Sequence, residues 1–162
     1  MSELDKVDRT IIRLLMGDGR MSSAEIARRI GEISERSVRY RLDRLIKDGV
    51  MQVSAITHPR AVGYEVIADV WLEIEPGRVL DVAHKVAGFQ QVSYVGCSTG
   101  DRDLSIQVYA RNNADLYQFV TEVIGNIPGV RRTTTVLVPL VLKDVYDWQI
   151  PEPAVTNGKE AS

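Results

Sequence analysis

Apolar residues recur at intervals of three and four along the first fifty residues, a spacing that places their side chains on one face of a helix. Three such runs follow one another, and each starts after an aspartate or a serine and stops at a glycine. Asp and Ser side chains accept hydrogen bonds from the N–H groups at a helix start, and glycine is typical of a helix end. We therefore expect three short helices, with start residues Asp5, Ser22 and Ser34 and closing glycines Gly17, Gly31 and Gly49.

The third predicted helix is rich in cations, with five Lys or Arg and two Asp between Arg36 and Asp48. Taken alone, such a helix is most often a solvated surface. A short capped helix, a glycine turn and a polar helix start nevertheless form the layout of a helix-turn-helix, whose second helix enters the major groove of DNA. Arginine pairs with guanine through two hydrogen bonds, and hydroxyls reach phosphates or base edges. The predicted DNA-contacting residues are Ser34, Arg36, Ser37, Arg39, Tyr40, Arg41 and Arg44.

The helical pattern weakens over residues 50–64, where Pro59 and Gly63 interrupt it. We expect a short strand there, followed by a linker, and we place the end of the first domain at residue 60. Beyond the linker, apolar residues alternate over 65–75, which indicates a strand with one buried face. Further elements follow in turn: helices over 78–87 and 113–126, and strands over 90–97, 103–110 and 130–143.

The order strand, helix, strand, strand, helix, strand predicts a ferredoxin-like domain, in which a four-stranded antiparallel sheet carries both helices on one face. The expected fold class is α+β, with a helix-turn-helix domain over residues 1–60 and a ferredoxin-like βαββαβ domain over 61–146. Residues 147–162 follow this domain, and within them residues 151–162 are polar, contain proline and lack a periodic pattern. We expect them to form a disordered tail.

The predicted sheet carries apolar side chains on the face that its helices leave open. An apolar patch of this extent usually marks an interface, although a few of its residues also fit isolated surface positions. Pro139 falls inside the last predicted strand, which suits a strand at the edge of the sheet. The residues assigned to the open face are Ile67, Trp71, Val95, Tyr109, Leu137 and Val141.

Composition narrows the class of protein. The 162 residues are 44% apolar and 26% charged, with one cysteine and no run of eighteen apolar residues. These features favour a soluble cytoplasmic protein without a membrane span, a secretion signal or an internal disulfide. The charge is uneven, because residues 1–60 carry a net charge of +3 and the remainder −5, so the first part is the one suited to an anionic partner.

Residues for catalysis or metal binding are sparse. His58 lies in the linker and His84 on a helix, and neither has a metal-ligating residue three or four positions further on. Cys97 follows a glycine in a predicted strand, which indicates a small core residue. The glycines between Gly96 and Gly100 are not followed by the Lys and Ser or Thr of a phosphate loop. We expect no catalytic residue, no metal and no cofactor.

An ordered set of motifs extends from Leu4 to Lys143: Leu4-Asp5 with Asp8 and Ile11-Ile12, Asp18-Gly19-Arg20, Ser23 with Glu25-Ile26-Ala27, Ser34 with Val38, Arg41 and Arg44-Leu45, Gly49-Val50, Pro59 with Gly63, Thr99-Gly100-Asp101 with Asp103, and Pro128-Gly129-Val130 with Thr134. No single motif is diagnostic. The whole set resembles the leucine-responsive and AsnC-type family of prokaryotic transcription regulators, also called feast/famine proteins.

This resemblance implies a winged or strand-extended helix-turn-helix that binds double-stranded DNA, followed by a ferredoxin-like regulatory domain. Members pack two sheets face to face into homodimers, which often assemble into tetramers, octamers or hexadecamers. The dimer interface is then expected at Ile67, Trp71, Tyr109, Leu137 and Val141. Many members bind an amino acid at a contact between dimers, near the loop that matches residues 98–103. The effector-binding residues implied here are Thr99, Gly100, Arg102, Asp103 and Thr134.

Two positions depart from the family pattern. Glu32 and Ile33 stand between Gly31 and Ser34 where one apolar residue is usual, so we expect a longer turn. Arg102 replaces an aromatic residue, which favours a polar or acidic amino acid over leucine as the effector. Two alternatives stay open. One is a tetrapyrrole decarboxylase-like enzyme of the same architecture, which the acidic second domain disfavours, and the other is an architectural DNA-binding protein without a ligand.

Overall fold

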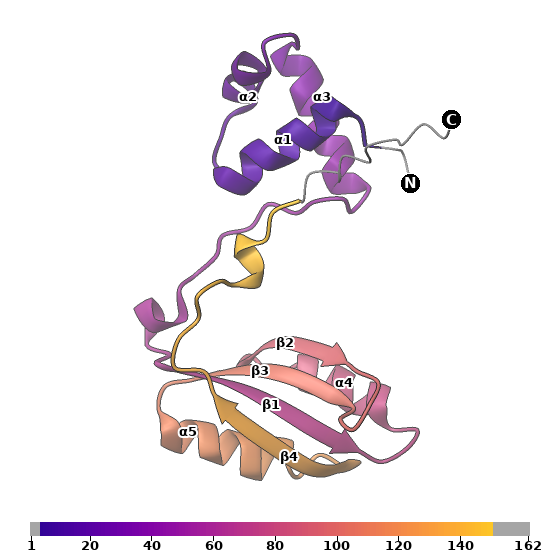
Figure 1. Ribbon diagram of the computed structural model, residues 1–162, viewed down its shortest axis with the longest axis vertical. Coiled ribbons are helices and arrows are strands. Elements are labelled where there is room, and N and C mark those ends of the chain that lie inside the picture. Colours follow the sequence, from indigo (N-terminus) through magenta and orange to yellow (C-terminus); the bar gives the residue numbers. More distant parts are fainter. Residues whose placement is uncertain (1–3, 151–162) are drawn as a thin grey trace, which may run out of the picture. The chain divides into compact units, whose positions relative to one another are not determined.

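The computed structural model describes residues 4–150, and its internal contacts divide the chain into two compact units (Figure 1). The first unit comprises the chain up to Ile56 together with the segment that begins at Asp144. The second unit runs from Thr57 to Lys143. Each unit has its own hydrophobic core.

The C-terminal segment departs from the predicted organisation. The sequence pattern places residues 144–146 in the second domain and 147–150 in a disordered tail, whereas both pack with the first unit. The segment lacks the periodicity of a long helix or a strand, and its apolar residues find their partners near the other end of the sequence, so no local pattern reports the contact. The remaining residues of the predicted tail, 151–162, lie outside the described part of the chain.

Three helices form the first unit: α1 (Lys6–Gly17), α2 (Ser23–Ile30) and α3 (Glu35–Lys47). The predicted caps are confirmed, because the side chain before each helix accepts a hydrogen bond from a backbone N–H group of the first turn, at Asp5, Ser22 and Ser34. Gly31 follows α2 with a φ angle of 86°, a left-handed conformation that disfavours residues with a side chain. The helix-turn-helix is therefore present where the sequence predicts it.

The apolar faces of these helices meet in one core, in which Ile11, Ile26, Val38 and Leu45 are almost completely buried. Each such side chain contributes roughly 1.5–3 kcal/mol of hydrophobic free energy, so this small core holds the unit together. The strand expected after α3 does not form. The described residues 51–58 have no strand beside them to supply hydrogen bonds, and they lead into a short 3-10 turn, Pro59–Val62.

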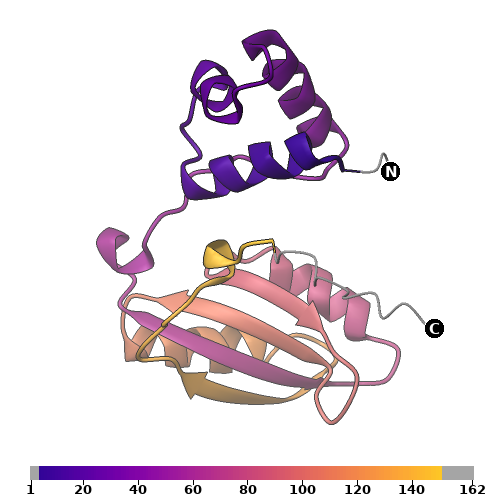
Figure 2. The ribbon, with the colours of Figure 1, turned by 45° about the horizontal axis from the view of Figure 1, so that its top comes forward.

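The second unit is a four-stranded antiparallel sheet in the order β2-β3-β1-β4, with its helices on one face (Figure 2). The predicted βαββαβ order and the α+β fold class are confirmed. A π-helical segment, Phe119–Ile124, continues the second helix with a wider turn that sequence periodicity does not reveal. The elements are β1 (Val66–Ile74), α4 (Val79–Ala87), β2 (Val92–Cys97), β3 (Leu104–Ala110), α5 (Asn113–Gln118) and β4 (Val130–Leu137).

Strand alternation gives the sheet two different faces. Alternate residues of β1 and β3, among them Val70, Leu72 and Val108, are completely buried beneath the helices. In the same core, the rings of Phe89 and Phe119 meet edge to face with centroids 5.5 Å apart. The intervening residues of β1 and β3 lie on the opposite face, which is the open face of the sheet.

Three residues assigned to the open face lie elsewhere. Leu137 pairs with Ala68 and Val95 pairs with Ile106, and because paired residues share a face, both lie on the helix side. Val141 lies beyond the sheet, since β4 ends before it. The alternation of apolar and polar residues does not identify the faces of these two strands. β4 has a run of threonines without alternation, and β2 contains a register shift. These residues are therefore wrongly placed by the sequence pattern.

Three further positions complete the sheet. Val136 is the apolar residue of β4 on the open face, where it pairs with Asp69 and is 46% exposed. Pro139 follows β4 instead of lying within it, although β4 is an edge strand as expected. Cys97 is exposed at the end of the other edge strand, so its assignment to the core is wrong.

Candidate nucleic-acid interface and effector loop

The first turns of α3 present polar side chains to solvent. Arg36 and Arg39 are exposed, and Tyr40 is 70% exposed. Arg39 donates a hydrogen bond to Glu35, one turn earlier, in an ion pair that solvent surrounds. Exposed pairs of this kind contribute at most about 1 kcal/mol, so the arginine exchanges Glu35 for another anion at little cost. This surface is suited to a polyanion.

Ser34 and Ser37 lie at the start of the same helix. The Oγ atom of Ser34 accepts a hydrogen bond from the backbone N of Ser37 at 3.2 Å, so its role in the structure is the helix cap. A serine hydroxyl also has a proton to donate, and the exposed position of Ser34 leaves that proton accessible to a phosphate. Ser37 is half-buried. Contact of either residue with DNA stays a prediction.

Arg41 and Arg44 bind inside the domain instead of extending the exposed face. The Nη1 atom of Arg41 lies 2.6 Å from Oδ2 of Asp5 and 2.8 Å from Oδ1 of Asp8, and Arg44 donates to the other carboxylate oxygen of Asp8. Asp8 is completely buried and both arginines are half-buried. Their guanidinium groups fasten α3 to α1 in this structure, and contact of either arginine with DNA stays a prediction.

The same ion pairs shift two pKa values. A hydrogen bond from the backbone N–H of Asp8, and then the guanidinium of Arg41, hold the pKa of Asp5 below its ordinary value of 3.8. Hydrogen bonds to Asp5 and to Asp8 raise the pKa of Arg41. Because Asp5 ionises more readily in the folded chain than in the unfolded chain, its ion pair stabilises the domain above about pH 4. That stabilisation is lost as the pH falls through the lowered pKa.

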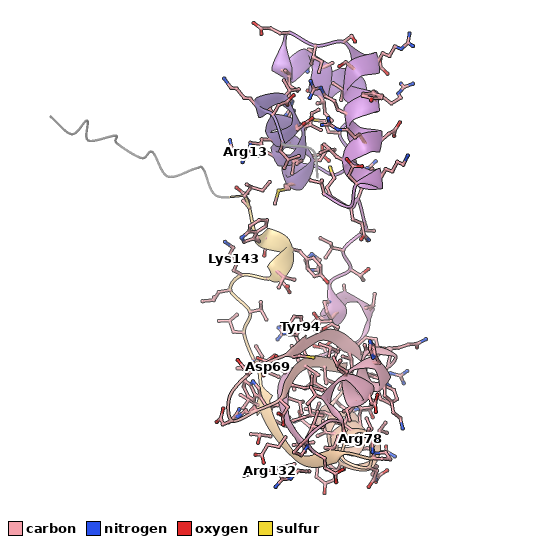
Figure 3. All side chains as sticks on the ribbon, turned by 90° about the vertical axis from the view of Figure 1, so that its right-hand side faces the viewer. Arg13, Asp69, Arg78, Tyr94, Arg132 and Lys143 are labelled. Carbon is pink, nitrogen blue, oxygen red and sulfur yellow. The ribbon has the colours of Figure 1, made fainter. Side chains whose placement is uncertain are left out.

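The open face of the sheet is a second candidate surface. Ile67, Trp71 and Tyr109 lie on it as the alternation predicts, and all three are half-buried. Between them, Asp69, which Figure 3 labels, accepts a hydrogen bond from the side-chain amide of Gln107 at 3.3 Å. Polar groups on this face therefore bind one another across β1 and β3.

The loop between β2 and β3, residues 98–103, is held by internal hydrogen bonds. The Oγ atom of Ser98 donates to the backbone O of Arg102 at 2.8 Å, and the backbone N of Ser98 donates to the O of Asp103 at 2.9 Å. Oδ2 of Asp103 accepts from the backbone N of Ile74 at 2.7 Å, where the pairing of β1 with β4 shifts register. Asp103 thus has a structural role at the end of β1, whatever it contributes to a ligand.

The loop also brings Arg102 to the open face. Its guanidinium carbon lies 4.7 Å from the centre of the Trp71 ring, within the range of a cation–π interaction. Thr134 is the cross-strand neighbour of Trp71, so a cation, an aromatic ring and a hydroxyl group occupy one region. Thr99 and Gly100 are exposed in the loop, and Gly100 has a φ angle of 144°.

Trp71 is the member of this cluster that sequence reasoning assigns only to a dimer interface. The alternation of residues along β1 identifies the face on which Trp71 lies. Its pairing with Thr134 follows once β1 and β4 are aligned. The stacking of Arg102 depends on the path of the loop, which no short-range pattern specifies. This is why the sequence alone does not join the tryptophan to the effector loop.

Residues 4–150 include both histidines of the sequence. Both histidines, His58 and His84, are exposed. Within this part of the chain, no three His, Cys, Asp or Glu side chains are grouped so that they could hold a metal ion. None of its helices has the length and the apolar character that crossing a membrane requires.

Comparison with known proteins assigns each unit to a domain type. Residues 4–50 match the model of a winged helix-turn-helix DNA-binding domain. Residues 67–146 match the model of the Lrp/AsnC ligand binding domain. Together these matches span most of the described chain, in the order that the fold shows.

Relatives match over nearly their whole length. The chain is 39% identical over 145 residues to an uncharacterized HTH-type transcriptional regulator of Pyrococcus horikoshii, which covers 89% of this chain and 91% of the relative. It is 33% identical over 148 residues to the HTH-type transcriptional regulator FL11 of Pyrococcus abyssi, covering 91% and 97%.

A solved structure shows the same fold. A transcriptional regulator of Neisseria meningitidis in complex with L-Met aligns with a TM-score of 0.81 at 23% identity, covering 88% of this chain and 94% of that one. The matched domain models, the relatives and the shared architecture agree. The chain belongs to the Lrp/AsnC family of helix-turn-helix transcription regulators.

Proposed function

We propose that this regulator binds duplex DNA as a two-fold homodimer through the exposed face of α3, and that an amino acid bound beside loop 98–103 modulates its binding or assembly. The different roles of the arginines of α3 support the proposal that this helix binds DNA. Arg36 and Arg39 face solvent, while Arg41 and Arg44 anchor the helix to α1. A helix anchored on one side with exposed cations on its outer face is suited to entering a groove.

The proposed homodimer forms when the open sheet faces of two copies of the chain pack together. Ile67, Trp71, Tyr109 and Val136 supply the apolar area that such a contact needs. Two recognition helices related by a dyad meet successive major grooves, so we expect half-sites about one helical turn, or ~34 Å, apart. Further contacts between dimers, in tetramers or octamers, then involve loop 98–103.

Changing Arg36 and Arg39 to alanine tests this interface. We expect each substitution to weaken binding by ~1–3 kcal/mol where the side chain contacts a base, and to lower the salt dependence where it contacts a phosphate. Fluorescence anisotropy with a DNA fragment that the wild type retains, repeated at several salt concentrations, measures both quantities.

A control variant removes two exposed cations from the second unit, Lys85 and Arg111, and thereby makes the same change in net charge. We expect it to bind DNA with wild-type affinity. If the Arg36→Ala/Arg39→Ala variant keeps full, salt-dependent affinity, then α3 does not form the interface.

For the effector, we propose an amino acid whose carboxylate meets Arg102 or the backbone amides of Thr99 and Gly100, with its side chain near Trp71 and Thr134. Support comes from the grouping of these residues and from the match to a ligand-binding domain. The structural relative from Neisseria meningitidis was solved with L-Met. A cation in this position favours a polar or acidic amino acid, because charge-assisted hydrogen bonds are stronger than hydrogen bonds between neutral groups.

Two conservative substitutions test the effector site. Thr134→Val removes a hydroxyl at nearly constant volume, and Asp103→Asn removes a charge that attracts an α-ammonium group while keeping an oxygen for the backbone N of Ile74. We expect each to lower the affinity for the amino acid by about tenfold to a hundredfold, since one hydrogen bond to a charged group contributes ~1.5–3 kcal/mol. Calorimetric titration with each of the twenty amino acids measures the affinity.

Thr133→Val serves as the comparison, because Thr133 lies next to Thr134 but on the helix side of β4. It is expected to bind the ligand as the wild type does. Wild-type affinity in both Thr134→Val and Asp103→Asn would remove the site from this loop. Absence of binding for every amino acid would favour an architectural DNA-binding protein.

A further inference from the structure

The C-terminal part of the described chain, residues 144–150, has a structure of its own. It begins with a 3-10 turn, Val145–Asp147, in which two carboxylates accept backbone hydrogen bonds. Oδ1 of Asp144 accepts from the N of Val145 at 2.6 Å, and Oδ2 of Asp147 accepts from the N of Asp144 at 3.0 Å. At the other end, Ile150 packs against the core of the three helices. The segment is therefore an ordered part of the DNA-binding domain.

The segment lies along an apolar groove of about 380 Å³ in that domain. One wall comes from the end of α1 and from the residues that follow α3, and the segment itself supplies the other. Its aromatic side chains, Tyr146 and Trp148, remain 57% and 56% exposed, so the contact is weak. The side chains that line the groove include Leu15, Met16, Met51, Tyr146, Trp148 and Ile150.

The groove leaves the proposed DNA-contacting face of α3 uncovered. Its lining, within the described residues, comes from α1, the loop after α1, residues 50–56 and the segment itself. Arg36, Arg39 and Tyr40 are all exposed with the segment in place. Packing of the segment is thus compatible with DNA binding and does not act as an inhibitory cover.

The segment also continues directly from the second unit. Only residues 138–143 separate it from β4, the strand that carries Thr134. The backbone N of Val138 donates to the O of Ile67 at 2.8 Å, and Arg60 donates to the backbone O of Pro139 at 3.0 Å. Because Arg60 belongs to the connection between α3 and β1, the two connections between the domains are hydrogen-bonded to each other.

We propose that residues 144–150 form a reversible clasp, which fastens the DNA-binding domain to β4 through a second connection. A short tether gives the clasp an effective concentration on the order of millimolar, so that a weak apolar contact is enough to close it. The same weakness lets a small change at β4 open it, as is typical of elements at the low-stability end of a protein. The coupling to ligand rests on the proposed function, since it requires the effector to bind at β4.

The experiment uses the full-length chain carrying Trp148→Ser and Ile150→Asp, which removes the apolar anchor. Hydrogen exchange followed by mass spectrometry, without DNA, is expected to rise about tenfold at residues 12–17 and at Val50 and Met51, whose backbone N–H groups donate to Leu45. Losing the burial of one large aliphatic side chain corresponds to about this factor or more. Leu142→Ser is the control, since Leu142 is 89% exposed and precedes the clasp. Wild-type exchange in the double variant overturns the proposal.

Three further outcomes are distinguishable in this experiment. If exchange rises throughout all three helices, the double variant has unfolded the domain, and Trp148→Ser alone then decides by the same local criterion. If the wild type binds no DNA but the variant shows the local rise, the proposed function fails and the clasp stands. If the wild type binds DNA and the variants show wild-type exchange, the clasp fails and the proposed function stands.

Discussion

Replacing Asp8 with alanine is expected to destabilise the DNA-binding domain by about 3–5 kcal/mol, enough to unfold most of it. Asp8 is completely buried and accepts hydrogen bonds from Arg41 and Arg44, so its removal leaves two half-buried guanidinium groups without their shared partner. A folded domain gains only about 0.05–0.15 kcal/mol per residue, and for a unit this small the total is of similar size to the loss. Thermal and urea unfolding followed by circular dichroism measure the change.

Asp43→Ala provides the comparison, since Asp43 is an exposed acid on α3. We expect it to change the unfolding free energy by no more than about 0.5 kcal/mol. An unchanged unfolding midpoint for Asp8→Ala would contradict the anchoring role of Arg41 and Arg44.

Replacing Trp71 with glutamate is expected to convert the proposed dimer into monomers. The residue lies on the open face between β3 and β4, where a two-fold contact would bury a carboxylate on each side. Burying an unpaired charge is strongly unfavourable. Ile67→Glu, on the same face, gives a second variant in case Arg102 pairs with the new carboxylate at position 71. Multi-angle light scattering reports the mass of each variant.

Leu137→Glu is an informative control, because the sequence pattern places Leu137 in the interface whereas the structure places it on the helix side of β4. The same substitution there is expected to leave the dimer intact. Dimers from both Trp71→Glu and Ile67→Glu would show that the open face has another partner. Monomers from Leu137→Glu alone would place the contact on the opposite face.

Local features of the chain are readable from the sequence because local chemistry determines them. A carboxylate or hydroxyl before a helix satisfies N–H groups only three residues away, so Asp5, Ser22 and Ser34 identify the three helices. Strict alternation along β1 and β3 likewise identifies their buried faces. The fold class follows from the order of these elements.

Features that depend on distant partners are not readable in this way. Arg41 looks like an outer cation on α3, and only its meeting with Asp5 and Asp8 on α1 gives it a structural role. Residues 147–150 look like a tail until the contact of their segment with the first unit is known. The face of Leu137 depends on the register of β4 against β1, which a run of threonines does not report.

The most direct test is the retention of genomic DNA fragments by the wild type and by the Arg36→Ala/Arg39→Ala variant, each with and without a panel of amino acids. A regulator that reads DNA through α3 enriches a small set of fragments whose half-sites lie about one helical turn apart, and an amino acid changes the amount retained. The double variant is expected to enrich none of them. Equal retention of fragments regardless of sequence, or unchanged enrichment by the double variant, would contradict DNA recognition through α3.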